Sequence, residues 1–167
     1  LHRMNRRYNT EQFEKIVQKL RNIYEDVILT TDIIVGFPGE TEEEFNKTYE
    51  FLKKIKFYKM HIFKYSVRTG TKAATMENQV ADCQKELRSK KLIKLSEENQ
   101  EFYNNEYIGK KVKVLVEEQE NGWYQGHTGN YLFVKLKSEK NIINKIIDIL
   151  VEKSQKNELI AENVTKM

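Results

Sequence analysis

Apolar residues near the start of the chain recur first with a helical period and then as a continuous run. Residues 13–24 place apolar side chains three or four positions apart, behind Asn9 and Gln12, a pair typical of a capping box. This pattern predicts a helix. The β-branched residues of 26–35 follow without a helical period, which predicts a buried parallel strand.

The same alternation of periods then repeats. Thr41 and Glu44 form a second capping-box pair before an apolar stripe, and residues 57–66 are rich in aromatic and β-branched side chains. The predicted order of helix, strand, helix, strand is that of a parallel α/β sheet. Because two parallel strands cannot form a stable sheet alone, we expect the chain to be the C-terminal part of a longer protein.

A long charged helix is predicted next, and the pattern changes to β after it. The helix is expected over residues 78–106, with these apolar members: Cys83, Leu87, Leu92, Leu95 and Phe102. From residue 107 the polar and apolar positions alternate, and Asn121-Gly122 is a strong hairpin signal. Residues 146–164 indicate two more strands about a polar turn. The predicted fold class is α/β followed by an all-β module of about five short strands, compatible with a small OB-like barrel.

Composition limits the classes of protein that the chain can be. It has 167 residues, a net charge of +4 and one cysteine, Cys83. No apolar run approaches the roughly 20 residues of a membrane span, and the N-terminus lacks the apolar centre of a signal peptide, so we expect a cytoplasmic protein without a membrane partner. Cys83 cannot form an internal disulfide, and no Cys/His spacing indicates zinc, so metal chemistry would need residues outside this chain.

Basic residues cluster in three places, although the bulk charge is only mildly positive. For each cluster taken alone, a solvated surface is the favoured interpretation. The clusters are Arg3 with Arg6 and Arg7, residues 85–94, and Lys110 with Lys111 and Lys113.

The turn between the first predicted strand and the second helix is a candidate binding site. Ligands of open α/β sheets and barrels lie at the carboxyl ends of strands, where residues 36–41 are expected. Glutamates at positions 40, 42, 43 and 44 would repel a phosphate, so a neutral or cationic ligand fits better. An ordinary strand–turn–helix connection, whose acids complement the helix dipole, is an equally good interpretation.

Four stretches of the chain together carry a resemblance to a known family. They are "RMNRRY", "DIIVGFPGETEEEF", "MHIFKYSVRTGTKAA" and "GHTGNYLFV", in this order. The chain resembles the radical S-adenosylmethionine (SAM) methylthiotransferases, which attach a methylthio group to an adenosine beside the tRNA anticodon or, in one branch, to a ribosomal protein aspartate. "HIFKYS" with "GHTGNY" is most similar to the branch that modifies N6-threonylcarbamoyladenosine at tRNA position 37.

The resemblance also implies an architecture and cofactors. Proteins of this family have an N-terminal domain with one 4Fe-4S cluster, a central radical SAM domain with a second cluster on a Cys-x-x-x-Cys-x-x-Cys loop, and a C-terminal TRAM domain. It implies that residues 1–77 are the end of the partial (β/α) barrel, 78–106 a connecting helix and 107–167 the TRAM module. With one cysteine in the chain, we expect this fragment to hold neither cluster and to be catalytically inactive by itself.

Candidate site residues follow from the resemblance together with the residue types. The cofactor candidates are Ile34, Val35, Gly36, Phe63, Tyr65 and Arg6. Barrel-core packing is an equal alternative for the two aromatics, as is a plain surface position for the arginine. His61 is not expected to be catalytic. The RNA candidates are Arg68, Thr71, Lys110, Lys111, Lys113, His127, Asn130 and Tyr131, a mix of cations for phosphate and rings for stacking.

Three functions stay open at this point. The leading hypothesis is part of a tRNA methylthiotransferase that binds the anticodon stem-loop and acts on N6-threonylcarbamoyladenosine, with N6-isopentenyladenosine as the alternative substrate. The second is a non-catalytic RNA-binding module, and the third is an unrelated α/β enzyme whose Gly-Phe-Pro-Gly loop holds another small molecule. An exposed sheet edge would also make self-association possible.

Overall fold

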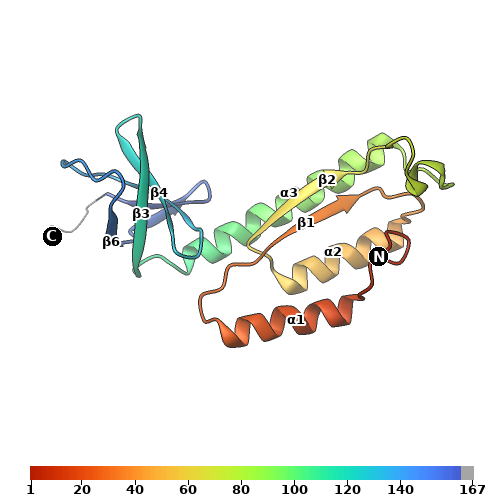
Figure 1. The fold of residues 1–167 in the computed structure, drawn as a ribbon, viewed down its shortest axis with the longest axis horizontal. Helices are drawn as coiled ribbons and strands as arrows, with labels where there is room; N and C mark the ends of the chain where they lie inside the picture. Colours follow the sequence, from red (N-terminus) through yellow and green to blue (C-terminus); the bar gives the residue numbers. More distant parts are fainter. Residues whose placement is uncertain (163–167) are drawn as a thin grey trace. The chain divides into compact units, whose positions relative to one another are not determined.

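The computed structural model describes residues 1–162. The chain divides into two compact units, Leu1–Asn99 and Gln100–Met167 (Figure 1). The division of the chain into three functional segments stays a prediction.

The first unit contains a two-stranded parallel sheet with helices packed on one face. Strand β1 (Thr30–Val35) pairs with β2 (Lys59–Lys64), and α1 (Thr10–Ile23) and α2 (Glu42–Ile55) connect to them in the predicted order. Both capping boxes are present, at the starts of α1 and α2. The α/β prediction is therefore confirmed for this unit, with β1 beginning four residues after the start of the apolar run.

A single apolar core holds this sheet to its helices. The core is formed by Val17, Val35, Phe45, Leu52, Ile55, Phe57, Met60, Leu92 and Leu95. The other face of β1 is open, because its residues alternate between exposed and more buried positions. The prediction of a strand buried on both faces is thus wrong for one face in this chain.

The long helix α3 (Asp82–Asn105) packs along β2 and begins four residues later than predicted. Ser96 Oγ accepts a hydrogen bond of 2.9 Å from the Met60 N–H, and Asn99 Nδ2 donates one of 3.0 Å to the Phe57 carbonyl. Helix α3 therefore covers part of the free edge of β2, whereas β1 pairs with no strand except β2 among residues 1–162. A short 3₁₀ helix, η1 (Lys72–Thr75), lies between β2 and α3.

The predicted apolar face of α3 is only partly correct. Leu92 and Leu95 are buried, but Cys83, Leu87 and Phe102 are exposed. The rest of the buried face within the first unit is polar, consisting of Lys85, Arg88, Ser89, Ser96 and Asn99. These positions recur every three or four residues, so the helix has a regular buried face that hydropathy alone does not reveal.

The second unit is an all-β module whose six strands form one sheet. The strands are β3 (Lys111–Glu120), β4 (Trp123–Thr128), β5 (Phe133–Leu136), β6 (Ile146–Leu150), β7 (Lys153–Gln155) and β8 (Glu158–Ala161). Their order in the sheet is β6-β3-β4-β5-β8-β7. The predicted hairpin is confirmed, because Asn121 and Gly122 both have positive φ and join antiparallel β3 and β4.

The prediction of about five strands is wrong by one. Residues 146–162 contain three strands where two were expected, and residues 163 and 164 of that stretch lie outside the described part of the chain. The additional strand, β7, has only three residues and carries no large apolar side chain, so its sequence gives no alternation to detect. It pairs with β8 across a turn at Lys156 and Asn157, where both residues have positive φ.

Candidate functional site

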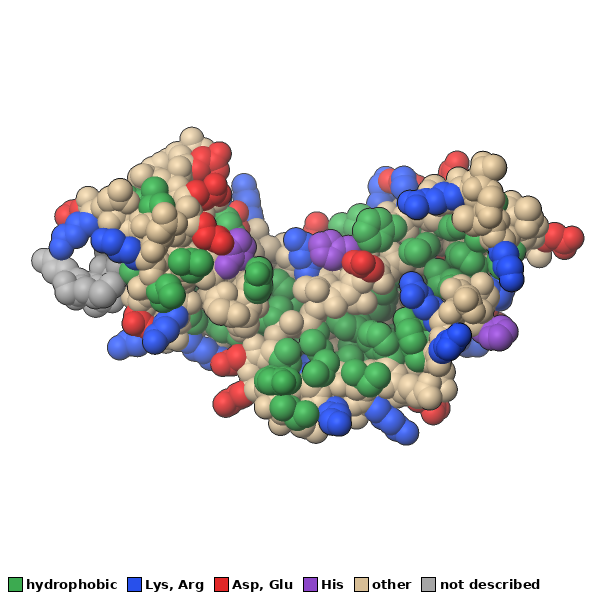
Figure 2. Space-filling view, in the orientation of Figure 1, with side chains coloured by type: hydrophobic (Ala, Val, Ile, Leu, Met, Phe, Trp, Pro, Cys, Tyr) green, Lys and Arg blue, Asp and Glu red, His purple; other side chains and the backbone are tan. Residues whose placement is uncertain are grey.

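The open face of β1 and β2 brings two predicted cofactor residues together. Ile34 is directly opposite Phe63 in the parallel register, and Asp32 is opposite His61. Ile34 is 40% exposed and Phe63 is 53% exposed. Figure 2 shows apolar side chains at the surface over these strands, with a histidine and an acid among them. Phe63 therefore lies outside the apolar core of the first unit.

The other predicted cofactor residues lie at the carboxyl ends of the strands or away from them. Val35 and Gly36 are buried, and the Tyr65 N–H extends the strand pairing by donating to the Val35 carbonyl at 2.9 Å. The Tyr65 ring stands edge-on to Phe37, 5.4 Å between centroids, and its hydroxyl is buried without a hydrogen-bond partner among the described residues. Arg6 is exposed, and its backbone N–H donates to the Leu1 carbonyl at 2.9 Å.

The loop after β1 is shaped by two glycines and one carboxylate. Gly36 and Gly39 have φ values of +72° and +78°, which side-chain-bearing residues rarely adopt. The Gly36 N–H donates to Glu40 Oε2 at 2.7 Å. A Cβ at Gly36 would collide with the Lys85 side chain from α3. The close approach that Gly36 permits is therefore to α3.

Each of the four glutamates that follow this loop has a cationic partner. Glu40 and Glu42 both pair with Arg88, at 2.7 and 3.1 Å, while Glu43 pairs with Lys47 at 2.7 Å and Glu44 with Arg3 at 2.8 Å. Hydrogen bonds from Arg3 and from the Thr41 backbone hold the pKa of Glu44 below its ordinary value. Because the acids are paired, their repulsion of an anion is weaker than the sequence suggests.

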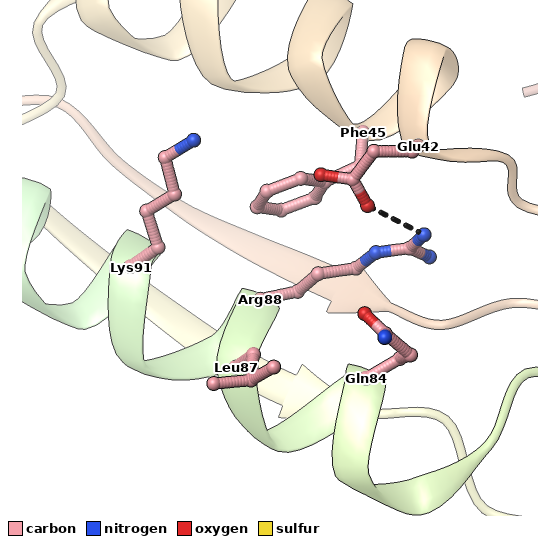
Figure 3. A pocket seen from close by; sticks show the side chains of 6 residues that line it. All are labelled: Glu42, Phe45, Gln84, Leu87, Arg88 and Lys91. Carbon is pink, nitrogen blue, oxygen red and sulfur yellow. Dashed lines mark hydrogen bonds and ion pairs between the residues drawn. The ribbon is translucent and has the colours of Figure 1, made fainter.

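A groove between α2 and α3 lies beside this charge cluster (Figure 3). It has a volume of about 450 Å³ and is lined by Glu42, Phe45, Gln84, Leu87, Arg88 and Lys91. The Arg88 guanidinium lies 5.3 Å from the Phe45 ring centroid, and Lys91 Nζ lies 4.5 Å from that of Tyr49. Sequence reasoning missed this groove, because its cations were interpreted as part of a solvated helix face.

The loop after β2 holds two RNA candidates in one turn. Arg68 and Thr71 are both exposed. The Arg68 carbonyl accepts hydrogen bonds from the Thr71 N–H at 3.2 Å and from its hydroxyl at 2.8 Å. The turn leaves the Arg68 side chain at the surface beyond the end of a strand.

In the second unit the turn between β4 and β5 groups three more RNA candidates. Tyr131 is 81% exposed and has a φ of +68°, an uncommon conformation for a bulky residue. Its N–H donates to the Thr128 carbonyl at 2.9 Å, and Asn130 Nδ2 donates to Tyr107 Oη at 2.8 Å. The His127 ring centroid lies 5.9 Å from that of Tyr131.

A row of three apolar side chains and one histidine, which sequence reasoning missed, crosses the outer face of this sheet. Ile146, Leu115, His127 and Phe133 are successive partners on β6, β3, β4 and β5. Leu115 is 44% exposed and Ile146 is 68% exposed. Leu115 alternates with two buried valines, so strict alternation would have placed it on the outer face. Lys110, Lys111 and Lys113 are all exposed near one end of β3.

The residues present do not provide an iron–sulfur ligand set. A 4Fe-4S cluster is held by cysteine thiolates, and the chain has one cysteine, the exposed Cys83. Residues 1–162 contain no group of three His, Cys, Asp or Glu side chains placed to hold a metal ion. Within the same residues, no helix has the length and apolar character that crossing a membrane requires.

Comparison with known proteins gives matches over both units. Residues 1–52 match the radical SAM superfamily. The chain is 40% identical over 159 residues to a threonylcarbamoyladenosine tRNA methylthiotransferase of Bacillus subtilis, covering 92% of this chain and 35% of that protein. It is 37% identical over 164 residues to a tRNA-2-methylthio-N(6)-dimethylallyladenosine synthase of Caldicellulosiruptor saccharolyticus, covering 97% of this chain and 35% of the relative. A synthase of the same name from Clostridium tetani is 39% identical over 167 residues, 98% of this chain and 37% of the relative.

These matches confirm the resemblance to radical SAM tRNA methylthiotransferases. The chain spans about a third of the length of the curated relatives it matches. Relatives named for the two different adenosine derivatives are similarly identical to it, so identity does not separate the two substrates.

Proposed function

We propose that this chain, whose relatives are radical SAM tRNA methylthiotransferases, is the part of such an enzyme that holds the cofactor adenosine and the tRNA. The observation that carries the proposal is the 40% identity to the Bacillus subtilis enzyme over 92% of the chain, which includes both units. In this proposal the first unit ends a partial barrel, α3 connects the units, and the second unit is an OB-like TRAM module.

The proposed substrate is N6-threonylcarbamoyladenosine at position 37 of tRNA, which receives a methylthio group at C2. The stretches "HIFKYS" and "GHTGNY" support this branch. N6-isopentenyladenosine is the alternative, supported by the synthases at 37 and 39% identity. A tRNA substrate implies a cytoplasmic enzyme.

The open face of β1 and β2 fits an adenosine better than a phosphate. In the proposal Ile34 and Phe63 pack against its rings, and the ends of both strands, including Tyr65, offer backbone groups to the base edge. Arg6 is a candidate for the cofactor carboxylate. In this family S-adenosylmethionine supplies a radical that would remove the hydrogen from C2 of the adenine in the tRNA nucleotide. Cys83 alone cannot hold a cluster, so the two 4Fe-4S clusters would be bound outside this chain, which by itself would be inactive.

The second unit and the loop after β2 are the proposed RNA-binding surfaces, with the anticodon stem-loop as partner. Exposed lysines at one end of β3 suit phosphate, while the rings of His127 and Tyr131 suit unpaired bases. Arg68 and Thr71 would contact the nucleotide that enters the barrel.

The test is mass spectrometry of tRNA nucleosides from cells with and without the gene that encodes this chain. We expect loss of the methylthio form of N6-threonylcarbamoyladenosine while isopentenyl derivatives persist. Loss of the isopentenyl derivatives instead would assign the sister substrate. No change in either would overturn the enzymatic proposal.

A non-catalytic RNA-binding module is the second candidate, favoured by the exposed ring and lysines of the second unit. It predicts that the chain binds an anticodon stem-loop in a fluorescence anisotropy titration, with affinity that falls steeply as salt rises. The double variant Lys111→Glu, Lys113→Glu should weaken binding, whereas the double variant Lys19→Glu, Lys53→Glu, at exposed positions on α1 and α2, serves as a charge-matched control. Binding with unaltered tRNA nucleosides in cells would favour this candidate.

A further inference from the structure

A largely buried ion pair joins α3 to the loop that follows β1. Arg88 Nη1 lies 2.7 Å from Glu40 Oε2 and donates a second hydrogen bond of 3.1 Å to the Glu40 carbonyl. The Arg88 and Glu40 side chains are only 7% and 12% exposed. Two contacts to one residue fix the guanidinium against both the side chain and the backbone of the loop.

The same carboxylate oxygen also fixes the end of the strand. Glu40 Oε2 accepts the Gly36 N–H at 2.7 Å, and Gly36 adopts a φ of +72°. A carboxylate this little exposed needs a cation to remain charged and in place. The conformation at Gly36 therefore depends on Arg88, a residue of a different element 52 positions along the chain.

A second residue of α3 supports the loop from the same side. Lys85, one turn before Arg88, packs its carbon chain against Gly36, where any side chain would collide with it. Its Nζ pairs with Asp82 at 3.0 Å and lies 5.7 Å from the Tyr65 ring centroid. Helix α3 thus contacts the ends of both strands of the sheet.

We propose that Arg88 is a positioning residue for the end of β1: through Glu40 it sets the backbone of Val35 and Gly36, beside the ligand-facing Ile34. The inference rests on the proposed function, in which this strand end contacts the cofactor adenosine. Arg88 itself lies in the groove between α2 and α3, which is lined by neither Ile34 nor Phe63.

Arg88 also pairs with Glu42, and this second contact provides a matched control. Arg88 Nη2 lies 3.1 Å from Glu42 Oε2, and the Glu42 side chain is 64% exposed (Figure 3). Glu42→Gln removes an ion pair from the same arginine but leaves the Glu40–Gly36 hydrogen bond intact. A merely stabilising role for Arg88 would not distinguish Gly36 from other amides of the sheet.

The first test is amide proton NMR on the full chain. In Arg88→Met we expect the Gly36 amide proton to move upfield and to exchange about tenfold faster, because a hydrogen bond to a charged acceptor is weakened. Ile62 in β2 should be unchanged, Arg88→Lys should restore part of the effect, and Glu42→Gln should match the unmodified chain. If Arg88→Met does not fold, Glu40→Gln tests the same bond through its acceptor. An unchanged Gly36 amide, or an equal change at Ile62, would overturn the inference.

The second test titrates S-adenosylmethionine into the same samples and follows the Ile34 and Gly36 amides. We expect the dissociation constant to rise about tenfold in Arg88→Met, less in Arg88→Lys, and not in Glu42→Gln. Equal affinities in all samples would overturn the positioning role while the proposed function stands. No shift in the unmodified chain would instead count against the proposed cofactor site, and the positioning role would fall with it, whatever the amide exchange shows.

Discussion

Helices α2 and α3 pack against the same apolar core, but they do so with different chemistry. The buried residues of α2 are Phe45, Leu52 and Ile55, and its charged residues lie at the periphery. On the buried face of α3, Leu92 and Leu95 are surrounded by polar side chains. The comparison shows that a helix can be specified by hydrogen bonds and ion pairs as well as by an apolar stripe.

The reason for the difference lies in what each helix covers. Helix α2 meets the apolar side chains of the sheet, so burying carbon is sufficient. Helix α3 meets the edge of β2 and the loop after β1, where backbone N–H and carbonyl groups need partners. Ser96, Asn99 and Arg88 supply those partners.

The largest effect on folding stability is expected from a substitution in the apolar face of α2. Phe45→Ala should lower the free energy of unfolding of the chain by about 3–5 kcal/mol, because it leaves a cavity in place of the ring of a residue that is 1% exposed. Urea unfolding followed by circular dichroism measures the change. The control is the same substitution at an exposed position: Phe102→Ala on α3, where Phe102 is 48% exposed, should lower the free energy of unfolding far less. Equal losses would mean that the core is not where the structure places it.

A smaller loss of folding stability is expected when a hydrogen bond from the polar face of α3 is removed. Ser96→Ala should cost about 1–3 kcal/mol, because it leaves the buried Met60 N–H without its acceptor. Amide exchange at Met60 should accelerate together with the loss of stability. Ser66→Ala, at an exposed position just after β2, should leave both quantities unchanged. If Ser96→Ala changed neither the free energy of unfolding nor the Met60 amide exchange, α3 would not cover the edge of β2 as the structure shows.

At the start of α2 we expect a modest dependence on pH. The pKa of Glu44 is lowered in the folded chain, mainly by the hydrogen bond from Arg3, so the stabilisation is present above the unfolded-state value of about 4.3 and is lost as pH falls through the lower folded-state value. Glu44→Gln should cost less than about 1 kcal/mol at pH 6, since the pair is largely exposed.

Urea unfolding at pH 6 and pH 3 measures this effect. The difference between the Glu44→Gln variant and the unmodified chain should shrink at the lower pH. Glu50→Gln, at an exposed position on the same helix, should show no such difference. A stability difference between Glu44→Gln and the unmodified chain that grew toward pH 3 would contradict the lowered pKa of Glu44.

The smallest effect is expected at a leucine that the hydropathy pattern placed inside. Leu87→Ser should change the free energy of unfolding by no more than about 0.5 kcal/mol, because Leu87 is 62% exposed. Leu92→Ala on the same helix should cost about 2–5 kcal/mol, since Leu92 is fully buried. A large loss for Leu87→Ser would restore the apolar face predicted from the sequence.

Sequence reasoning found the elements whose signals are local. The capping pairs at Asn9 and Thr41, the hairpin at Asn121 and the continuous run before Gly36 each depend on neighbours within a few positions, and each is confirmed. Strand β7 was missed because three polar residues carry no period. It is defined by its pairing with β8.

For the candidate sites, the sequence by itself determined which residue types lie at the strand ends and turns. It also determined the resemblance of these stretches to one family. Only the tertiary structure decided that Ile34 faces Phe63, that Leu115 and Ile146 extend the row of His127 and Phe133, and that the glutamates after Gly39 are paired. The physical reason is distance along the chain. Caps and turns are made by residues close together in the sequence. Arg88 reaches Glu40 only when α3 packs along β2, so the sequence around either residue does not predict the contact.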